Sequence, residues 1–312
     1  MNCMDNAYKY MVAARCFTYN HVHYIEDTLK GFVLQETTFP SVYIIIDDAS
    51  TDGEQEFLKN WAEKYLSQDV ECLDWKAESY GRVLESRLTN NPNSLFVIIL
   101  LYENLFQKGK GYLKFDYIAK WLNDSKYLAI CEGDDYWVDR NKLQKQVDYL
   151  ESNDSVNIYV HNADKYICST DETVLFNTSI PTKIYGIKDV IKMKWFTPTA
   201  SFVYKNNVEV STLWRENGCN GDMALLYTNL LKGDLFYDST IMSVYRYGTP
   251  LSMSSASNKD ILMKKKINLY KTLNKITHNK YIVYTWFEML KIRLKKLPIM
   301  VTLCRMKSKL QK

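Results

Sequence analysis

YLAICEGDDYW, residues Tyr127–Trp137, joins an apolar segment that ends at Cys131 to three acids, Glu132, Asp134 and Asp135. The apolar segment predicts a buried strand, and open α/β sheets build ligand sites where such strands end. Three neighbouring carboxylates repel one another. Mg²⁺ or Mn²⁺ removes that repulsion, because these cations take oxygen ligands and bridge carboxylates to substrate phosphates. The stretch predicts a metal–diphosphate site or, alternatively, a solvated acidic turn.

Alternating strands and helices are expected before this stretch, which predicts a doubly wound α/β sheet. Pro40 would end the first helix, and Thr51 and Glu54 have the spacing of a capping box at the start of the second. Asn90–Ser94 is a predicted turn. The expected strands are Tyr10–Ala14, Val42–Ile46, Leu95–Tyr102, Asn157–His161 and Phe236–Tyr247. The expected helices are Tyr24–Phe39, Asp52–Leu66, Tyr112–Leu122, Lys142–Glu151 and Gly221–Lys232.

Polar side chains follow the first two strands, where a nucleotide would bind in such a sheet. Tyr19 can stack on a base, although a surface-loop tyrosine is an equal alternative. Asp48 can accept a hydrogen bond from a base N–H or a ribose hydroxyl. A phosphatase of the class in which an Asp of the enzyme is phosphorylated is excluded. Such enzymes carry two Asp separated by one residue, whereas Asp47 and Asp48 are adjacent.

The charge of the chain is uneven. Residues 259–312 hold 15 Lys and Arg and only two acids, so an acidic globular body precedes a basic tail. The seven cysteines form no CxxC pair, and their odd number favours a reducing compartment. The N-terminus does not have the pattern of a signal peptide. No apolar run approaches the ~20 residues that a membrane span needs.

Three segments occur in a recognisable order: Tyr19-Asn20, DDASTDG at residues 47–53, and EGDDYW at residues 132–137. Together they resemble glycosyltransferase family 2, the inverting GT-A enzymes, over roughly residues 8–250. Glu103-Asn104 with Gln107 and Gly109, and KLQKQ at residues 142–146, resemble its bacterial surface-polysaccharide branch. The resemblance implies a GT-A, Rossmann-like mixed sheet and a nucleotide-diphospho-sugar donor, most simply a UDP-sugar. It also implies Mg²⁺ or Mn²⁺ and a glycan or lipid-linked glycan acceptor.

The resemblance also implies donor-site roles. Asp48 would bind the base, with Tyr19 and Phe17 near it. Asp134 would lie at the ribose–diphosphate end, and Asp135 would ligate the metal. Phe17 departs from the small polar residue that is frequent at its position in the family, and the Glu that begins EGDDYW stands where the family often has Asp.

The resemblance implies a catalytic residue and a donor-binding residue in the second half. In this family the Asp of a Gly-Asp pair some 90 residues after the metal motif is the catalytic base, and Asp222 follows Asp135 by 87 residues. The alternative is a helix N-cap. Arg246 would pair with the diphosphate, or alternatively form a structural ion pair.

The tail is expected to form a basic helical extension, residues 251–312, after a catalytic domain, residues 1–250. That domain divides near residue 140 into a nucleotide-sugar half and an acceptor half. In the tail, apolar residues recur at helical spacing among basic ones: Val283, Trp286, Leu290, Leu294 and Leu297. Such a helix suits an anionic membrane surface, here the inner face of the cell membrane. The alternatives are packing on the catalytic body or an oligomer contact. No nucleic-acid-binding module is present.

Two other functions are alternatives to a transferase. One is a non-catalytic nucleotide-sugar-binding or membrane scaffold on the same fold, against which the intact Asp48, Asp135 and Asp222 argue. The other is a sugar-nucleotide pyrophosphorylase. It needs a glycine-rich loop after the first strand, and Arg15–His21 contains no glycine.

Overall fold

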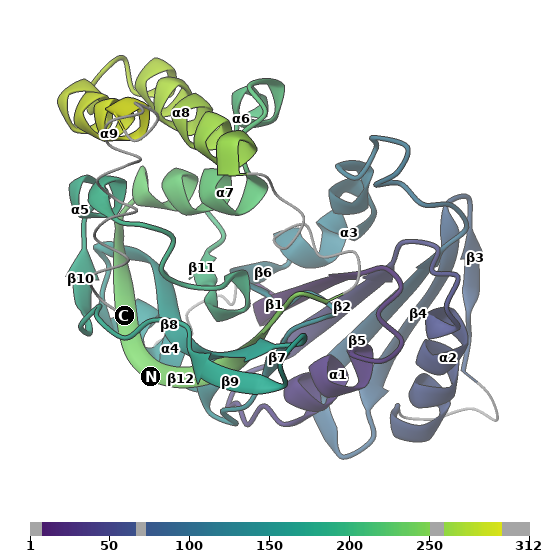
Figure 1. Ribbon diagram of the computed structural model, residues 1–312. Helices are drawn as coiled ribbons and strands as arrows, with labels where there is room; N and C mark the ends of the chain where they lie inside the picture. Colours follow the sequence, from purple (N-terminus) through teal and green to yellow (C-terminus); the bar gives the residue numbers. More distant parts are fainter. Residues whose placement is uncertain (1–7, 67–72, 250–258, 295–312) are drawn as a thin grey trace.

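The computed structural model describes residues 8–66, 73–249 and 259–294 (Figure 1). Its described strands form one 12-stranded mixed sheet in the order β10-β12-β8-β11-β6-β1-β2-β5-β4-β3, with β7 beside β12 and β9 beside β8. The strands are β1 (Tyr10–Thr18), β2 (Ser41–Asp47), β3 (Lys76–Glu78), β4 (Gly81–Leu88), β5 (Asn91–Leu101), β6 (Ser125–Ile130), β7 (Tyr136–Trp137), β8 (Val156–Ile167), β9 (Glu172–Leu175), β10 (Lys183–Tyr185), β11 (Val203–Lys205) and β12 (Asp234–Tyr247). The helices are α1 (Ile25–Val33), α2 (Glu54–Tyr65), α3 (Leu113–Asn123), α4 (Lys142–Ser152), α5 (Ile187–Lys192), α6 (Thr212–Glu216), α7 (Gly221–Leu230), α8 (Lys259–Ile276) and α9 (Ile282–Leu294), with one 3-10 turn, η1 (Thr199–Ser201).

β1 lies at the centre of the parallel part of the sheet. It pairs in parallel with β2 on one side and with β6 on the other, and β5 extends the parallel set beyond β2. These strands are apolar over most of their length because both of their faces are covered. The loops after β1, β2 and β6 therefore meet at one edge. This is the topological switch point where open α/β sheets bind ligands.

Helices cover both faces of the sheet (Figure 1). Val12 and Ala14 of β1 belong to a core that includes residues of α1, α2 and α4. Ala13, between them, belongs to a core that includes Ile118 of α3. Successive side chains of a strand point to opposite faces, so α3 lies on the face opposite α1. The predicted α/β doubly wound mixed sheet is confirmed.

The C-terminal helices pack on the body. α8 contacts α6 and α7, and α9 contacts α5 and α8. Leu269, Tyr270 and Leu273 of α8 are buried in the core that α5–α7 also build. The predicted domain boundary near residue 250, and Leu297 of the predicted apolar face, lie outside the described residues. In the described ranges, no helix combines the length and the apolar character needed to span a bilayer.

Three local predictions are wrong. The capping box of Thr51 and Glu54 is not formed, because Gly53 is the N-cap of α2 and the Glu54 side chain turns inward. The first helix ends at Val33 rather than Phe39. There the Gln35 amide donates to the Gly31 carbonyl at 3.1 Å and to the Asp139 carbonyl at 2.9 Å, which stabilises an irregular segment before Pro40. The predicted turn at Asn90–Ser94 is instead largely the start of β5.

Candidate functional site

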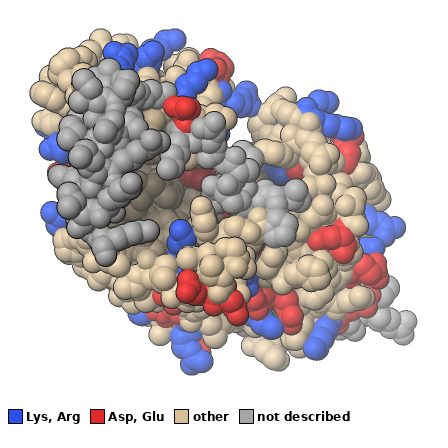
Figure 2. All heavy atoms as spheres, in the orientation of Figure 1, with Lys and Arg blue, Asp and Glu red and all other residues tan. Residues whose placement is uncertain are grey.

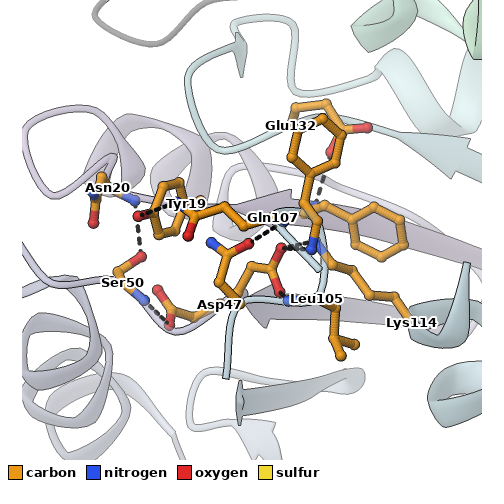
Figure 3. Close-up of polar contacts among 12 residues, drawn as sticks. Tyr19, Asn20, Asp47, Ser50, Leu105, Gln107, Lys114 and Glu132 are labelled. Carbon is orange, nitrogen blue, oxygen red and sulfur yellow. Dashed lines mark hydrogen bonds and ion pairs between the residues drawn. The ribbon is translucent and has the colours of Figure 1, made fainter. Parts of the chain in front are cut away.

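Glu54, buried at the start of α2, ties together the loops that follow β1 and β2. Its carboxylate accepts hydrogen bonds from the Thr18 hydroxyl at 2.5 Å, the His21 backbone N–H at 2.9 Å and the Ser50 hydroxyl at 3.0 Å. Burial raises the pKa of Glu54 to about 7. The same hydroxyl of Ser50 accepts from the Asn20 N–H at 2.8 Å (Figure 3). The two loops are thus held as one unit at the edge of the sheet.

Asp48, the predicted base ligand, is buried after β2 and fixes a third loop. Its carboxylate accepts from the backbone N–H groups of Leu105 and Phe106 at 2.8 and 3.1 Å, and it pairs with the Lys114 ammonium at 2.6 Å (Figure 3). These bonds connect β2 to the loop before α3. Contact with a nucleotide base stays a prediction for Asp48. The structure adds a loop-anchoring role that uses most of its acceptor capacity.

Tyr19 and Phe17 border the space in front of this loop. The Tyr19 hydroxyl accepts from the Gln107 amide at 3.2 Å, which connects the loop after β1 to the loop that Asp48 anchors (Figure 3). The Phe17 ring meets Phe115 of α3 edge-on, with ring centroids 5.4 Å apart. The guanidinium of Arg15 lies 4.7 Å from the Phe17 ring centroid. Contact of either aromatic residue with a nucleotide base stays a prediction.

The first two acids of the motif have different partners. Glu132 accepts from Arg15 at 3.0 Å and from the Phe17 backbone N–H at 2.9 Å. Asp134 accepts from the Thr249 hydroxyl at 3.1 Å. Glu132 is thereby turned toward β1, and Asp134 toward the end of β12. The motif is thus an ordered part of the sheet edge, which disfavours the alternative of a solvated acidic turn.

Asp135, the predicted metal ligand, is almost fully buried. Its carboxylate accepts from the Arg246 backbone N–H at 2.9 Å. Burial first, and then the charge of Asp134, hold the pKa of Asp135 well above its ordinary value. A bound divalent cation would favour the ionised form of such a carboxylate. Within the described part of the chain, no cluster of three or more His, Cys, Asp or Glu residues could hold a metal without other ligands. The metal role of Asp135 stays a prediction, and a cation held there would need further ligands from phosphate and water.

Arg246 contacts the predicted metal ligand Asp135 through its backbone N–H. Its guanidinium forms an ion pair with Asp27 of α1, donates to the Asp134 carbonyl at 3.0 Å, and stacks over Tyr136 at 4.5 Å from the ring centroid. This is the structural ion pair that the sequence left open. Contact with a diphosphate stays a prediction, and it would require the Asp27 pair to open.

Gly133 lies where only a glycine fits. A Cβ at this position would lie 2.1 Å from the Thr18 hydroxyl oxygen, which Glu54 holds in place. We predict that Gly133→Ala lowers the free energy of unfolding by about 1–3 kcal/mol, because overpacking displaces that hydroxyl. Urea denaturation measures the change. Gly221→Ala, where a Cβ meets no atom within 4 Å, is the matched control. Equal stability of the two variants would contradict the steric argument.

Asp222 is in the first turn of α7, 87 residues after Asp135 in the sequence. The cap of this helix is Asn220, whose side chain accepts from the Asp222 N–H at 2.9 Å, so the N-cap alternative for Asp222 is wrong. Among the described residues, none donates a hydrogen bond to the Asp222 carboxylate or forms an ion pair with it. Asp222 is exposed by its accessible surface. Neighbouring protein atoms, and after them the negative charge of Glu132, nevertheless raise the pKa of Asp222 to about 6, and Arg15 partly opposes this. Asp222 thus shares the electrostatic environment of the acid motif.

Sequence reasoning missed several residues that build the site. The spacing of Glu54 from Thr51 favours a helix cap instead, and the sequence carries no signal for Lys114 or Thr28. The Thr28 hydroxyl donates to the Asp135 carbonyl at 2.7 Å. Arg15 was visible only as part of the loop that lacks glycine. An ionisable residue on an otherwise apolar central strand is the one signal that could have identified it.

Comparison with known proteins supports the fold. No family model matches the chain. The uncharacterized proteins Rv1520 of Mycobacterium tuberculosis (strain ATCC 25618 / H37Rv) and Mb1547 of Mycobacterium bovis are each 31% identical to it over 144 residues. This match covers 46% of the chain and 32% of each relative, so the chain spans about a third of their length.

Solved structures cover more of the chain. S. aureus TarS 1-349 in complex with UDP-GlcNAc has a TM-score of 0.54 at 13% identity, over 85% of this chain and 66% of that one. S. aureus TarS in a second structure has a TM-score of 0.54 at 12% identity, over 93% of this chain and 44% of that one. At such identities the likeness concerns the fold, and the chain has the fold of the GT-A glycosyltransferases.

Proposed function

We propose that the chain is an inverting glycosyltransferase that moves a sugar from a nucleotide-diphospho-sugar, most simply a UDP-sugar, to a hydroxyl of a surface glycan or lipid-linked glycan. The observation that carries the proposal is the position of Asp222. The GT-A fold brings a carboxylate with no hydrogen-bonding partner among the described residues into the environment of Glu132 and Arg15. A free carboxylate in a cleft, with a pKa shifted toward neutrality, is a candidate general base.

Asp222 would act on the acceptor. Its carboxylate takes the proton of the acceptor hydroxyl while that oxygen forms a bond to the anomeric carbon. The bond from the anomeric carbon to the diphosphate oxygen breaks at the same time, and the electron pair leaves with the nucleoside diphosphate. Attack from the face opposite the leaving group inverts the anomeric centre. No nucleophile of the protein takes part in this reaction.

The donor would lie along the ends of β1, β2 and β6. Tyr19 and Phe17 offer aromatic faces to the base, and Asp48 offers its remaining acceptor capacity. Asp134 would meet the ribose–diphosphate end, and Asp135 would hold Mg²⁺ or Mn²⁺. The cation would neutralise charge that develops on the leaving diphosphate. The raised pKa of the buried Asp135, and its orientation by the Arg246 N–H, support this role.

The test is a panel of sugar nucleotides. The purified protein is incubated with Mn²⁺, an alkyl glycoside acceptor and UDP-, GDP-, dTDP- or CMP-sugars, and released nucleotide is measured with and without a chelator. We expect release from a nucleotide-diphospho-sugar that depends on both metal and acceptor, and a product of inverted anomeric configuration by NMR. Absence of release from every donor would favour the non-catalytic scaffold instead.

We also propose that α9 contacts an anionic membrane surface. Its predicted apolar face points to solvent: Val283 is 61% exposed, Trp286 is 52% exposed and the neighbouring Phe287 is 53% exposed. The opposite face packs inward, where Thr285 and Asn274 of α8 exchange hydrogen bonds. An exposed aromatic face beside basic residues suits the headgroup region of an anionic bilayer.

Basic side chains lie on α9 and on the neighbouring α5. Lys and Arg side chains gather along the upper edge of the molecule, over α8 and α9 (Figure 2). Lys291 and Arg293 are in the last turn of α9, and Lys188 and Lys192 of α5 lie 5.5 and 5.4 Å from the ring centroid of Tyr284. Residues 259–294 hold nine Lys and Arg and two acids. This charge matches an anionic surface.

Vesicle sedimentation tests the membrane contact. We predict that the protein binds vesicles of equal parts phosphatidylglycerol and phosphatidylcholine, and that a Trp286→Ser, Phe287→Ser double variant binds at least about fivefold more weakly. Ile184→Ser, on β10 and 42% exposed, is the control for loss of a surface apolar residue. Equal binding by all three proteins would overturn the contact. So would equal binding to vesicles of phosphatidylcholine alone.

A further inference from the structure

A cavity of about 800 Å³ lies between α3 and the α6–α7 pair, and it extends away from Asp222. Ala13 and Arg15 of β1 contribute to its floor, together with residues of β6 and β11. The small side chain of Ala13 leaves room between the helices that cover this face of the sheet. None of the donor-site residues Tyr19, Asp48 and Asp135 lines this cavity. Donor binding therefore does not account for the cavity.

The cavity is elongated. Its lining follows α3 from Tyr112, just before the helix, to Asn123, its last residue. The 11 residues of α3 span about 16 Å at 1.5 Å per residue. Asp222 and Arg15 mark the end nearest the acid motif. Asn123 and Asn206 line the opposite end. Asn123 ends α3, and the Asn206 N–H donates to the Lys126 carbonyl at the start of β6, so both lie at the edge of the sheet where β6 begins.

The long walls are mostly apolar. The larger apolar side chains of these walls include Tyr112, Phe115, Leu128, Val210, Trp214 and Leu225. Three further charged side chains, Asp116, Glu209 and Arg215, also line the cavity. Phe115 and Val210 are each 44% exposed, and Tyr112 is 49% exposed although the Arg215 guanidinium lies 4.6 Å from its ring centroid. Uncovered apolar surface that lines a concave site is typical of ligand binding.

A polar group without a partner lies at the catalytic end. The Nε of Arg15 is buried, and in the described part of the chain it has no hydrogen-bond partner. Arg15 is anchored to Glu132 at 3.0 Å and lines the cavity beside Asp222. Buried N–H groups are rarely left unsatisfied. Because this N–H is buried, a ligand in the cavity beside Asp222 would contact the exposed part of the Arg15 side chain, 13% of it, rather than Nε.

We infer that the cavity binds an acceptor that carries an alkyl chain next to its reacting hydroxyl. The inference rests on the proposed function, since it makes Asp222 the base that meets the hydroxyl. The polar head lies at Asp222 and Arg15, and the chain extends along α3 between Phe115 and Trp214. The acceptor is thus an amphipathic glycoside or alcohol, such as the head of a lipid-linked glycan. A free water-soluble sugar would leave the apolar walls uncovered.

Binding is tested without the donor. Octyl β-glucoside, below its micelle concentration, and methyl β-glucoside are titrated against the protein by tryptophan fluorescence. We expect octyl β-glucoside to bind at least tenfold more tightly, because burial of its additional methylenes is favourable. Trp214→Phe should remove the signal of binding in the cavity. Trp286→Phe should not, because Trp286 is on the exposed face of α9.

Matched variants test where the alkyl chain of the ligand lies. Val210→Asp, in the cavity wall, should weaken octyl β-glucoside binding about tenfold. Val174→Asp, on β9 and 46% exposed, should leave it within about twofold. Equal affinity for the two glucosides would overturn the inference, as would equal effects of the two variants. A signal that is lost with Trp286→Phe and kept with Trp214→Phe would also overturn it.

A turnover arm separates this inference from the proposed function. With an active donor, kcat/KM for octyl β-glucoside should exceed that for methyl β-glucoside at least tenfold, and Val210→Asp should remove most of the difference. If no donor gives transfer but octyl β-glucoside still binds through Trp214, the proposed function fails and the cavity remains a binding site for alkyl chains. If transfer occurs with equal efficiency to both glucosides, the inference fails and the proposed function stands.

Discussion

Replacing Asp222 by asparagine is expected to lower kcat by about 10³-fold, within the range of about 10²–10⁴ contributed by a general base. The amide cannot take a proton from the acceptor hydroxyl. Asparagine nevertheless has the same shape, and the helix cap is made by Asn220, so α7 should remain intact. Donor KM should change little, because Asp222 is not placed at the donor. Steady-state kinetics, with the donor that the panel of sugar nucleotides identifies, measure kcat and donor KM separately.

The pH profile gives the same prediction an independent readout. Only the ionised form of Asp222 can act as a base. Because surrounding protein raises the pKa of Asp222 to about 6, kcat should fall as the pH drops through about 6 and level off above it. Asp222→Asn should lose this dependence along with its activity. Glu216→Gln, an exposed acid nearby on α6, should keep both. A kcat for Asp222→Asn within tenfold of the wild type would remove Asp222 from catalysis.

Replacing Asp135 by asparagine is expected to lower kcat/KM for the donor by at least about 10²-fold and to abolish the dependence on metal concentration. Asparagine keeps an oxygen that accepts from the Arg246 N–H, but it lacks the charge that holds a cation. The fold should not suffer, because burial penalises the ionised carboxylate and the neutral amide removes that cost. Turnover is measured across a Mn²⁺ titration, and stability is measured by heat denaturation without metal.

The control for this variant is Asp154→Asn, an exposed acid in the turn before β8. It should match the wild type in both measurements. Asp135→Asn with unchanged metal dependence would show that the cation, if one is used, is held elsewhere. Asp135→Asn that is clearly less stable than the wild type without metal would contradict the view that the buried charge is a cost to the apo fold.

The parts of the site that sequence predicted are local. The apolar run before EGDDYW and the polar residues after Val42–Ile46 mark strand ends, which depend on a few neighbouring residues. The structure places both at the same edge because β1 lies between β2 and β6. The helix expected at Gly221–Lys232 is α7, and the resemblance directed attention to Asp222 on it.

The parts that sequence missed depend on contacts between distant residues. Asp48 binds N–H groups 57 and 58 residues further along the chain. Arg246 pairs with Asp27, 219 residues away. Neither partner lies within the range of a local pattern. Glu54 was misassigned because its spacing from Thr51 also satisfies a capping box, and only the position of Thr18 on the neighbouring strand decides between the two.

The tail illustrates a related limit. Sequence correctly predicted a helix with an apolar face at Val283 and Trp286, but periodicity does not state which face is covered. In the structure the covered face of α9 includes Thr285, whose hydroxyl meets Asn274 of α8 at 2.8 Å. A buried hydrogen bond between two polar residues thus orients α9 and leaves its more apolar face exposed.

The central claim is that the edge formed by β1, β2 and β6 is a metal-dependent site for a nucleoside diphosphate. The most direct test is the shift in heat stability of the protein with Mn²⁺ and UDP, GDP, dTDP or CDP, because ligands that bind the native state raise its stability. We predict a shift with one nucleotide that requires Mn²⁺, persists in Asp222→Asn and disappears in Asp135→Asn. No shift with any nucleotide, or an equal shift in Asp135→Asn, would contradict the claim.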